Sequence, residues 1–189
     1  MEVNFSGKLI KDTDDGKIII NLQHGRKEGV TSFVSRDEIV LSEIPYKGDV
    51  ICGSVKQYYP NGKIFSIVEY KHGIQHGIMT SFFENGMEQV VAQYQNGKMD
   101  GPFKAFDEFG DIVNECTYCN GQKHGKNLLY YAKSQGGGVY EVSIYKEGCL
   151  NGDKVSFYPA GEIMSVTPYI EGRAQSYTVH YTKTGEKMD

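Results

Sequence analysis

Short stretches of apolar and aromatic residues, each about six to eight residues long, follow one another along this chain and are separated by turns that contain glycine. Two such stretches flank Pro-Asn-Gly at 60–62, and two more flank Glu-Asn-Gly at 84–86. No segment places apolar residues at i, i+3, i+4 and i+7 over three helical turns, so the pattern argues against long helices. It predicts an all-β chain made of hairpins.

Two columns of aromatic residues show that these hairpins repeat about every 24 residues. The first column consists of Tyr58, Phe82, Phe106, Tyr130, Phe157 and Tyr181, with steps of 24, 24, 24, 27 and 24 residues. The second consists of Tyr70, Tyr94, Tyr118, Tyr145 and Tyr169, with steps of 24, 24, 27 and 24 residues. Both columns lengthen by three residues in the same unit, which contains the insertion 132–138. One insertion therefore explains both irregularities.

The ends of the chain depart from the repeat. Residues 1–52 form degenerate N-terminal repeats or a cap, with Leu22 and Tyr46 still at the repeat spacing before Tyr70. Residues 53–189 hold the tandem repeats and end in a half repeat at 177–185. Atypical ends are expected, since terminal repeats close an otherwise open stack. We expect one continuous domain.

Each unit is predicted to be strand, tight turn, strand and tight connection. Asn and Gly accept the positive φ that a hairpin turn needs, so the Asn-Gly pairs mark the turns. The spacing Gly-x-x-x-Gly, at 73–77, 97–101, 121–125 and 148–152, marks the connections to the next hairpin. Successive hairpins should build an elongated, solenoid-like, single-layer antiparallel sheet in which contacts are mostly between neighbouring units.

Charge and cysteine content narrow the function classes. The net charge is −4 and no run of Lys and Arg occurs, which predicts no nucleic-acid partner and argues against an anionic membrane. The N-terminal residues do not resemble a signal peptide, and no apolar run reaches the roughly 18 residues of a membrane span. Four scattered cysteines are too few for a disulfide scaffold. We expect a cytoplasmic protein.

The repeat units resemble those of MORN-repeat proteins. Examples are Gly53-Ser-Val-Lys-Gln-Tyr-Tyr-Pro-Asn-Gly62 and Gly77-Ile-Met-Thr-Ser-Phe-Phe-Glu-Asn-Gly86. The resemblance is clear over 53–185, weak over 16–52, and strongest to the bacterial variant. It implies an open, curved sheet of hairpins and a role as an antitoxin or immunity protein that neutralises a toxin by binding it. Eukaryotic MORN arrays are linked to scaffolding and to phospholipids, but the lack of Trp and of a basic surplus argues against the lipid role here.

Other candidate chemistry is weak. Cys116 and Cys119 lack the second ligand pair of a structural zinc site, and His72 and His76 lie in a glycine-bounded connection. Gln135-Gly-Gly-Gly138 matches no phosphate-binding loop, and no helix follows it. No nucleophile lies in a recognisable catalytic motif. We therefore expect no catalytic residues, no metal site, no cofactor and no enzymatic activity.

A second set of aromatic residues directly follows the first column and forms the candidate protein-binding site: Tyr59, Phe83, Tyr131 and Tyr158. Strand side chains alternate between faces, so these rings should point opposite to the first column. A single sheet has two faces, and exposed aromatic patches mark interaction sites. The alternative is that these rings form the core and the first column is half exposed.

Two functions remain open. The first is a non-enzymatic protein that neutralises another protein, a toxin, by binding it. The second is a scaffold that self-associates through its unpaired end strands or lies at a membrane.

Overall fold

The computed structural model describes residues 4–188 and confirms the all-β class of antiparallel hairpins. The contacts divide the chain into two units, which are described separately. Unit 1 comprises Met1–Glu88 and Tyr94–Gly97, and unit 2 comprises Gln89–Gln93 and Lys98–Asp189. Strand β10 (Glu88–Gln95) contributes residues to both units.

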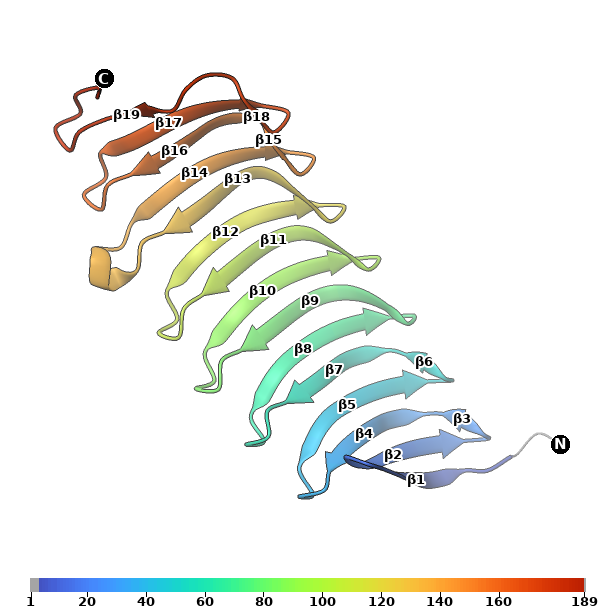
Figure 1. The fold of residues 1–189 in the computed structure, drawn as a ribbon. Helices are drawn as coiled ribbons and strands as arrows, with labels where there is room; N and C mark the ends of the chain where they lie inside the picture. Colours follow the sequence, from blue (N-terminus) through green and yellow to red (C-terminus); the bar gives the residue numbers. More distant parts are fainter. Residues whose placement is uncertain (1–3, 189) are drawn as a thin grey trace. The chain divides into compact units, whose positions relative to one another are not determined.

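In unit 1 the strands follow one another as antiparallel neighbours, and β1 lies at the outer end (Figure 1). They are β1 (Gly7–Thr13), β2 (Gly16–Gln23), β3 (Arg26–Lys27), β4 (Gly29–Ser35), β5 (Val40–Lys47), β6 (Val50–Ile51), β7 (Gly53–Tyr58), β8 (Ile64–Lys71) and β9 (Ile74–Phe82). The order of pairing is β1, β2, β4, β5, β7, β8 and β9. The short strands β3 and β6 pair with β2 and β5 and lead into β4 and β7. Pairing therefore continues across residue 52, from β5 to β7.

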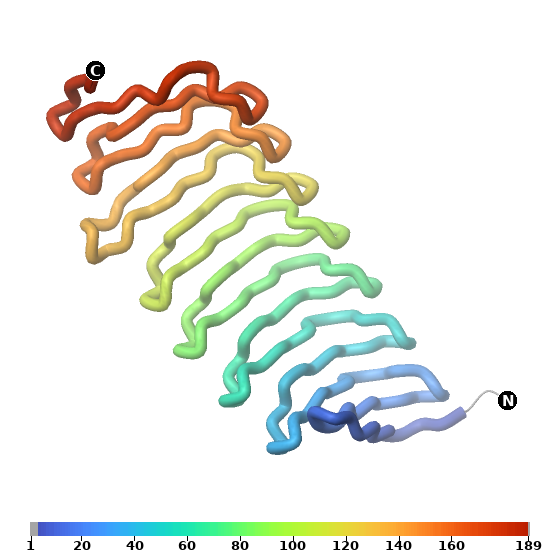
Figure 2. Tube along the Cα trace, in the orientation of Figure 1, coloured from blue at the N-terminus to red at the C-terminus, as the bar shows by residue number. Residues whose placement is uncertain are grey.

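Unit 2 repeats this arrangement, with the chain running back and forth between neighbouring strands (Figure 2). Its strands are β11 (Lys98–Phe106), β12 (Ile112–Cys119), β13 (Gln122–Tyr130), β14 (Val139–Lys146), β15 (Cys149–Leu150), β16 (Gly152–Phe157), β17 (Ile163–Ile170), β18 (Arg173–Ala174) and β19 (Val179–His180). Beyond β19, Tyr181 bridges to Lys187 across a turn. The insertion forms an enlarged turn with a 3-10 helix, η1 (Lys133–Gln135).

Tyrosines of the second aromatic column, and Tyr46 at the same repeat spacing, pair with glycines in the preceding long strand. The paired positions are Gly29 with Tyr46, Gly53 with Tyr70, Gly101 with Tyr118, Gly125 with Tyr145, and Gly152 with Tyr169. Paired residues point to the same side of an antiparallel sheet, so each Tyr ring lies beside a position without a side chain. We call this side the glycine–tyrosine face. It also carries most of the buried positions.

The two kinds of turn are where the sequence places them, but they differ in geometry. The connection at His72-Gly73 has positive φ at both residues, 52° and 78°, and so does Asn96-Gly97, with 50° and 80°. This is the backbone of a two-residue type I′ turn. At Pro60-Asn61-Gly62 the positive φ, 81°, occurs at Gly62. Proline fixes φ near −65°, which suits the second position of a type I turn and excludes type I′ there.

Candidate binding surface

The four predicted binding residues occupy equivalent positions at the start of the wider turns. Tyr59, Phe83, Tyr131 and Tyr158 each directly follow the last residue of a strand. The backbone N–H of each donates across its turn, for example from Tyr59 to the carbonyl oxygen of Lys63 at 2.8 Å and from Phe83 to that of Met87 at 2.9 Å. All four side chains are half-buried. Their backbone is therefore fixed by the turn.

In unit 1, hydrogen bonding and ring packing also fix the side chain of Tyr59. Its hydroxyl donates to the carbonyl oxygen of Phe82 at 2.7 Å, in the next hairpin. Its ring packs edge-to-face against Phe65, with the ring centroids 5.2 Å apart, and Phe65 is itself exposed. Phe83 has no hydroxyl to make the equivalent bond. The ring of Tyr59 is thus both partly accessible and rigidly held.

In unit 2, the hydroxyl bond recurs twice and the ring packing recurs once. The hydroxyl of Tyr131 donates to the carbonyl oxygen of Phe157 at 2.8 Å, and that of Tyr158 donates to the carbonyl oxygen of Tyr181 at 2.9 Å. Tyr131 packs edge-to-face against the exposed Tyr140, with centroids 5.1 Å apart. We call each group of such rings an aromatic cluster: Tyr59, Phe65 and Phe83 in unit 1, and Tyr131, Tyr140 and Tyr158 in unit 2. Sequence reasoning missed Phe65 and Tyr140.

The first aromatic column is half-buried, and two of its members bond to acidic residues. Tyr58 donates its hydroxyl proton to Glu43 at 2.7 Å, and Tyr130 donates to Glu115. Burial, followed by the hydrogen bond and the charge of the carboxylate, raises the pKa of Tyr58 to about 12. The same causes raise the pKa of Tyr130 to about 12. Both contacts link strands of successive hairpins.

These shifts predict how stability responds to alkali. A phenol whose pKa is higher in the folded state than its usual value of 10 holds its proton more tightly when folded. Its contribution to stability is therefore complete below pH 10 and is lost as the pH rises from 10 to about 12. Ultraviolet titration should show two tyrosines ionising near pH 12, and the double variant Tyr58→Phe, Tyr130→Phe should lack both. If all tyrosines ionise together near pH 10 in the folded wild-type protein, the two bonds do not form.

A row of buried and half-buried polar side chains lies on the glycine–tyrosine face of unit 2, and sequence reasoning did not identify it. It consists of Asn114, Asn127, Glu141, Ser143, Ser156, Ser165 and Thr167, and we call it the polar row. Asn127, only 3% exposed, donates to Ser143 at 3.3 Å and accepts from Asn114 at 3.1 Å and from Lys123 at 2.9 Å. A signal was present in the sequence: these positions carry small or polar residues between the two aromatic columns.

One member of the polar row, Glu141, forms an ion pair with Lys154, but the row does not bring together a catalytic set. The Nζ of Lys154 lies 2.9 Å from Glu141, which is 9% exposed, and this hydrogen bond raises the pKa of Lys154. Ser156 and Ser165 bond to each other, and Thr167 bonds to Thr178 at 2.8 Å. These side chains satisfy one another inside the sheet. The row is suited to holding neighbouring strands in register.

The residues with metal-binding side chains do not converge. Within residues 4–188, no group of three or more His, Cys, Asp or Glu side chains is placed to hold an ion. His72 is a turn residue with positive φ, Cys116 is buried and Cys119 is exposed. Burial raises the pKa of the Cys116 thiol. No helix in the described part of the chain has the length and apolar character needed to cross a membrane.

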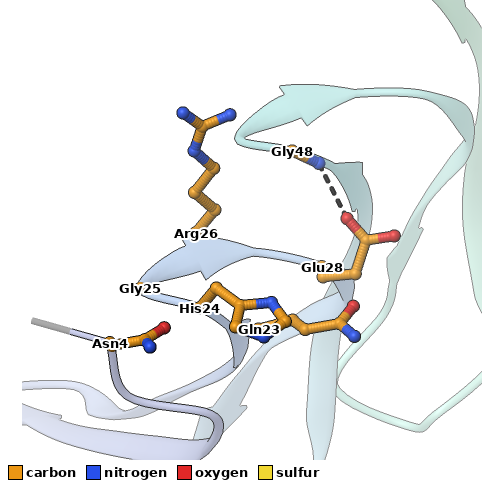
Figure 3. A pocket seen from close by; sticks show the side chains of 7 residues that line it. All are labelled: Asn4, Gln23, His24, Gly25, Arg26, Glu28 and Gly48. Atoms are coloured by element: carbon orange, nitrogen blue, oxygen red, sulfur yellow. Dashed lines mark hydrogen bonds between the residues drawn. The ribbon is translucent and has the colours of Figure 1, made fainter.

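An open polar hollow lies beside the connection between β2 and β3 (Figure 3). It is lined by Asn4, Gln23, His24, Gly25, Arg26, Glu28 and Gly48. The carboxylate of Glu28 already accepts a hydrogen bond from the backbone N–H of Gly48 at 2.8 Å. The side chain of Arg26 points away from His24 and Gln23 (Figure 3). The hollow therefore lacks the convergent polar groups of a specific ligand site.

Comparison with known proteins supports the repeat class. Three consecutive segments, residues 51–72, 75–96 and 99–120, match the MORN repeat variant family. They cover the first three of the predicted complete repeats, and residues 121–185 lie outside the matched segments. MORN repeats generally mediate binding to proteins or membranes and are typically non-enzymatic. No curated protein matches the sequence.

Proposed function

We propose that this chain is a non-enzymatic protein that binds another protein through its aromatic clusters. The observation that carries this proposal is that the rings are fixed before any partner arrives. Tyr131 and Tyr158 are half-buried and tied to neighbouring hairpins by their hydroxyls, and Tyr140 remains exposed. Tyr offers a large contact area that is apolar on one part and polar on the other. A pre-ordered ring loses little conformational entropy on binding.

The finer proposal is that binding neutralises the partner, as an antitoxin or immunity protein of the cytoplasm does. The resemblance of the repeat units to the bacterial MORN variant supports this role. The net charge of −4 and the absence of a Lys and Arg run in the sequence favour a protein partner over nucleic acid or an anionic membrane. Neutralising a partner by covering its surface requires contact and no catalysis. Partly exposed aromatic rings on a sheet are suited to such contact.

The test is capture of a partner by the tagged full-length chain from native lysate, compared among variants. Tyr131→Ala with Tyr158→Ala should reduce the retained partner, because losing central aromatic anchors costs about 2 kcal/mol or more, roughly 30-fold in Kd. Tyr177→Ala is the matched control, since Tyr177 is 95% exposed and lies outside both clusters. Circular dichroism would show that each variant folds.

Three outcomes separate the proposals. A partner whose activity is blocked by the wild-type chain, but not by the double variant, supports neutralisation through the unit 2 cluster. Equal capture by the wild type, by the double variant and by Tyr59→Ala with Phe83→Ala in unit 1 overturns the aromatic clusters as the site. Recovery of this chain without any other protein contradicts neutralisation and favours the scaffold.

A further inference from the structure

Strand β1 (Gly7–Thr13) leaves one edge of the unit 1 sheet open. Among the described residues it pairs with β2 alone, from Gly7 opposite Leu22 to Thr13 opposite Gly16. All of its residues are exposed, including Leu9 at 47% and Ile10 at 58%. An exposed strand edge that carries apolar side chains is a template for pairing with another chain.

The register with β2 shows which backbone groups face the open edge. Thr13 and Gly16 flank a two-residue turn, so they form a hydrogen-bonded pair. Hydrogen-bonded and non-hydrogen-bonded pairs alternate along antiparallel strands, so Leu9 and Lys11 also bond to β2. The N–H and C=O groups of Lys8, Ile10 and Asp12 therefore point away from β2. Three residues are ready to accept a further strand.

The sequence of β1 is complementary to itself when it runs antiparallel. If Ile10 lies opposite the same residue of a second copy, Lys8 of each copy lies opposite Asp12 of the other. Opposite charges and paired apolar side chains both stabilise cross-strand neighbours. Lys11 then lies opposite Leu9, where its aliphatic stem covers the apolar side chain. This is also the register that pairs the three outward-facing residues with one another.

We propose that β1 pairs antiparallel with β1 of a second copy of this chain and closes a two-fold symmetric dimer. This interface is independent of the partner-binding surface proposed above. Shifting the register by two residues either way removes the charge pairing or places Lys11 opposite Lys11. The last strand, β19, spans only Val179–His180 and offers a much shorter edge for head-to-tail growth. When the β1 edge of one copy pairs with the β1 edge of the other, neither β1 edge stays free. The assembly therefore ends at two copies.

A charge exchange on β1 tests this dimer in the full-length chain. Light scattering coupled to size exclusion should give a mass of about 42 kDa for the wild type, twice the 21.2 kDa of one chain. Lys8→Glu and Asp12→Lys each place like charges opposite one another at both ends of the pairing, and each should weaken dimerisation about tenfold or more. The double variant restores both pairs and should dimerise like the wild type.

Mixing the two single variants gives the sharpest readout. Lys8→Glu opposite Asp12→Lys makes two attractive pairs, so each variant should prefer the other over itself. Lys11→Glu is the matched control, because it makes the same charge change on the same strand without an acidic residue opposite. Ile10→Pro should abolish the dimer and keep the fold, since the N–H that it removes points away from β2.

Three outcomes would contradict the β1–β1 dimer. A wild type that stays at one chain mass across the whole concentration series overturns the proposal. So does a dimer that the single variants leave unchanged, or an assembly that grows without limit and ignores the charge exchange.

Discussion

Gly16→Ala should lower the free energy of unfolding by about 3 kcal/mol, because the new methyl group meets the backbone of the neighbouring strand. A Cβ at Gly16 would lie 2.1 Å from the carbonyl oxygen of Val34, and φ at this position is 152°. Backbone cannot move aside as a flexible side chain can. Urea unfolding followed by circular dichroism measures the change. Residues 7–23 should loosen first, since Gly16 begins β2 and ends the turn from β1.

The matched control is Gly62→Ala. Gly62 also has positive φ, 81°, but a Cβ there meets nothing within 4 Å. Gly62→Ala should lower the free energy of unfolding by about 1 kcal/mol, because a residue with a side chain pays this cost in a left-handed backbone conformation. If both substitutions cost the same, then the close approach of Val34 to Gly16 makes no contribution.

Asn127→Met should lower the free energy of unfolding by about 2–4 kcal/mol, because it strands the polar partners of a buried amide. Asn127 bonds with Asn114, Lys123 and Ser143, and removing it leaves these groups without that partner. Methionine is the residue that the repeat itself places at this position in another unit, at Met79. The shape of methionine is therefore compatible with the site, and the loss of stability in Asn127→Met measures the loss of polar contacts.

A triple variant separates the loss of hydrogen bonding from a change in packing at position 127. Asn127→Met, Asn114→Val and Ser143→Ala introduce the residues that an earlier repeat carries at the same positions, Met79, Val90 and Ala92. The variant replaces Asn127 together with two of its three partners and leaves Lys123 in place. Replacing both groups of a buried hydrogen bond by apolar groups is close to neutral, whereas removing one partner is costly. The triple variant should recover most of the loss in chemical denaturation. A triple variant that is no more stable than Asn127→Met would show that packing at this position, not hydrogen bonding, sets the cost.

The sequence predicts the repeat and the hairpins because both depend on local features. Glycine is needed at fixed positions of each turn, and aromatic residues recur at fixed positions of each strand. The structure confirms the antiparallel hairpins, and the insertion forms an enlarged turn. The type of turn is harder to predict from the sequence. Asn-Gly at 61–62 suggests a type I′ turn, but Pro60 requires type I. The side-chain oxygen of Asn61 accepts a hydrogen bond from the backbone N–H of Lys63 in this turn.

The polar row and the ring contacts were beyond sequence reasoning for a physical reason. A Ser or Asn in a strand is compatible with a wet face, and only the pairing register shows that Asn127 and Ser143 meet on a buried one. The hydroxyl bonds of Tyr59 and Tyr131 reach into the next hairpin, which the alternation of one strand does not show. Whether the four predicted rings bind a partner stays a prediction.

Within each unit, every strand pairs only with strands that are close to it along the chain. Few long loops must therefore be closed before contacts form, so the entropy lost on closing them is small. Any hairpin can act as the nucleus, and its neighbours can then add to it one at a time. In the variant Ile10→Pro, which should not dimerise, amide hydrogen exchange should accordingly be fastest at the strands of each unit that have a single neighbour, and it should slow down towards the middle of the unit.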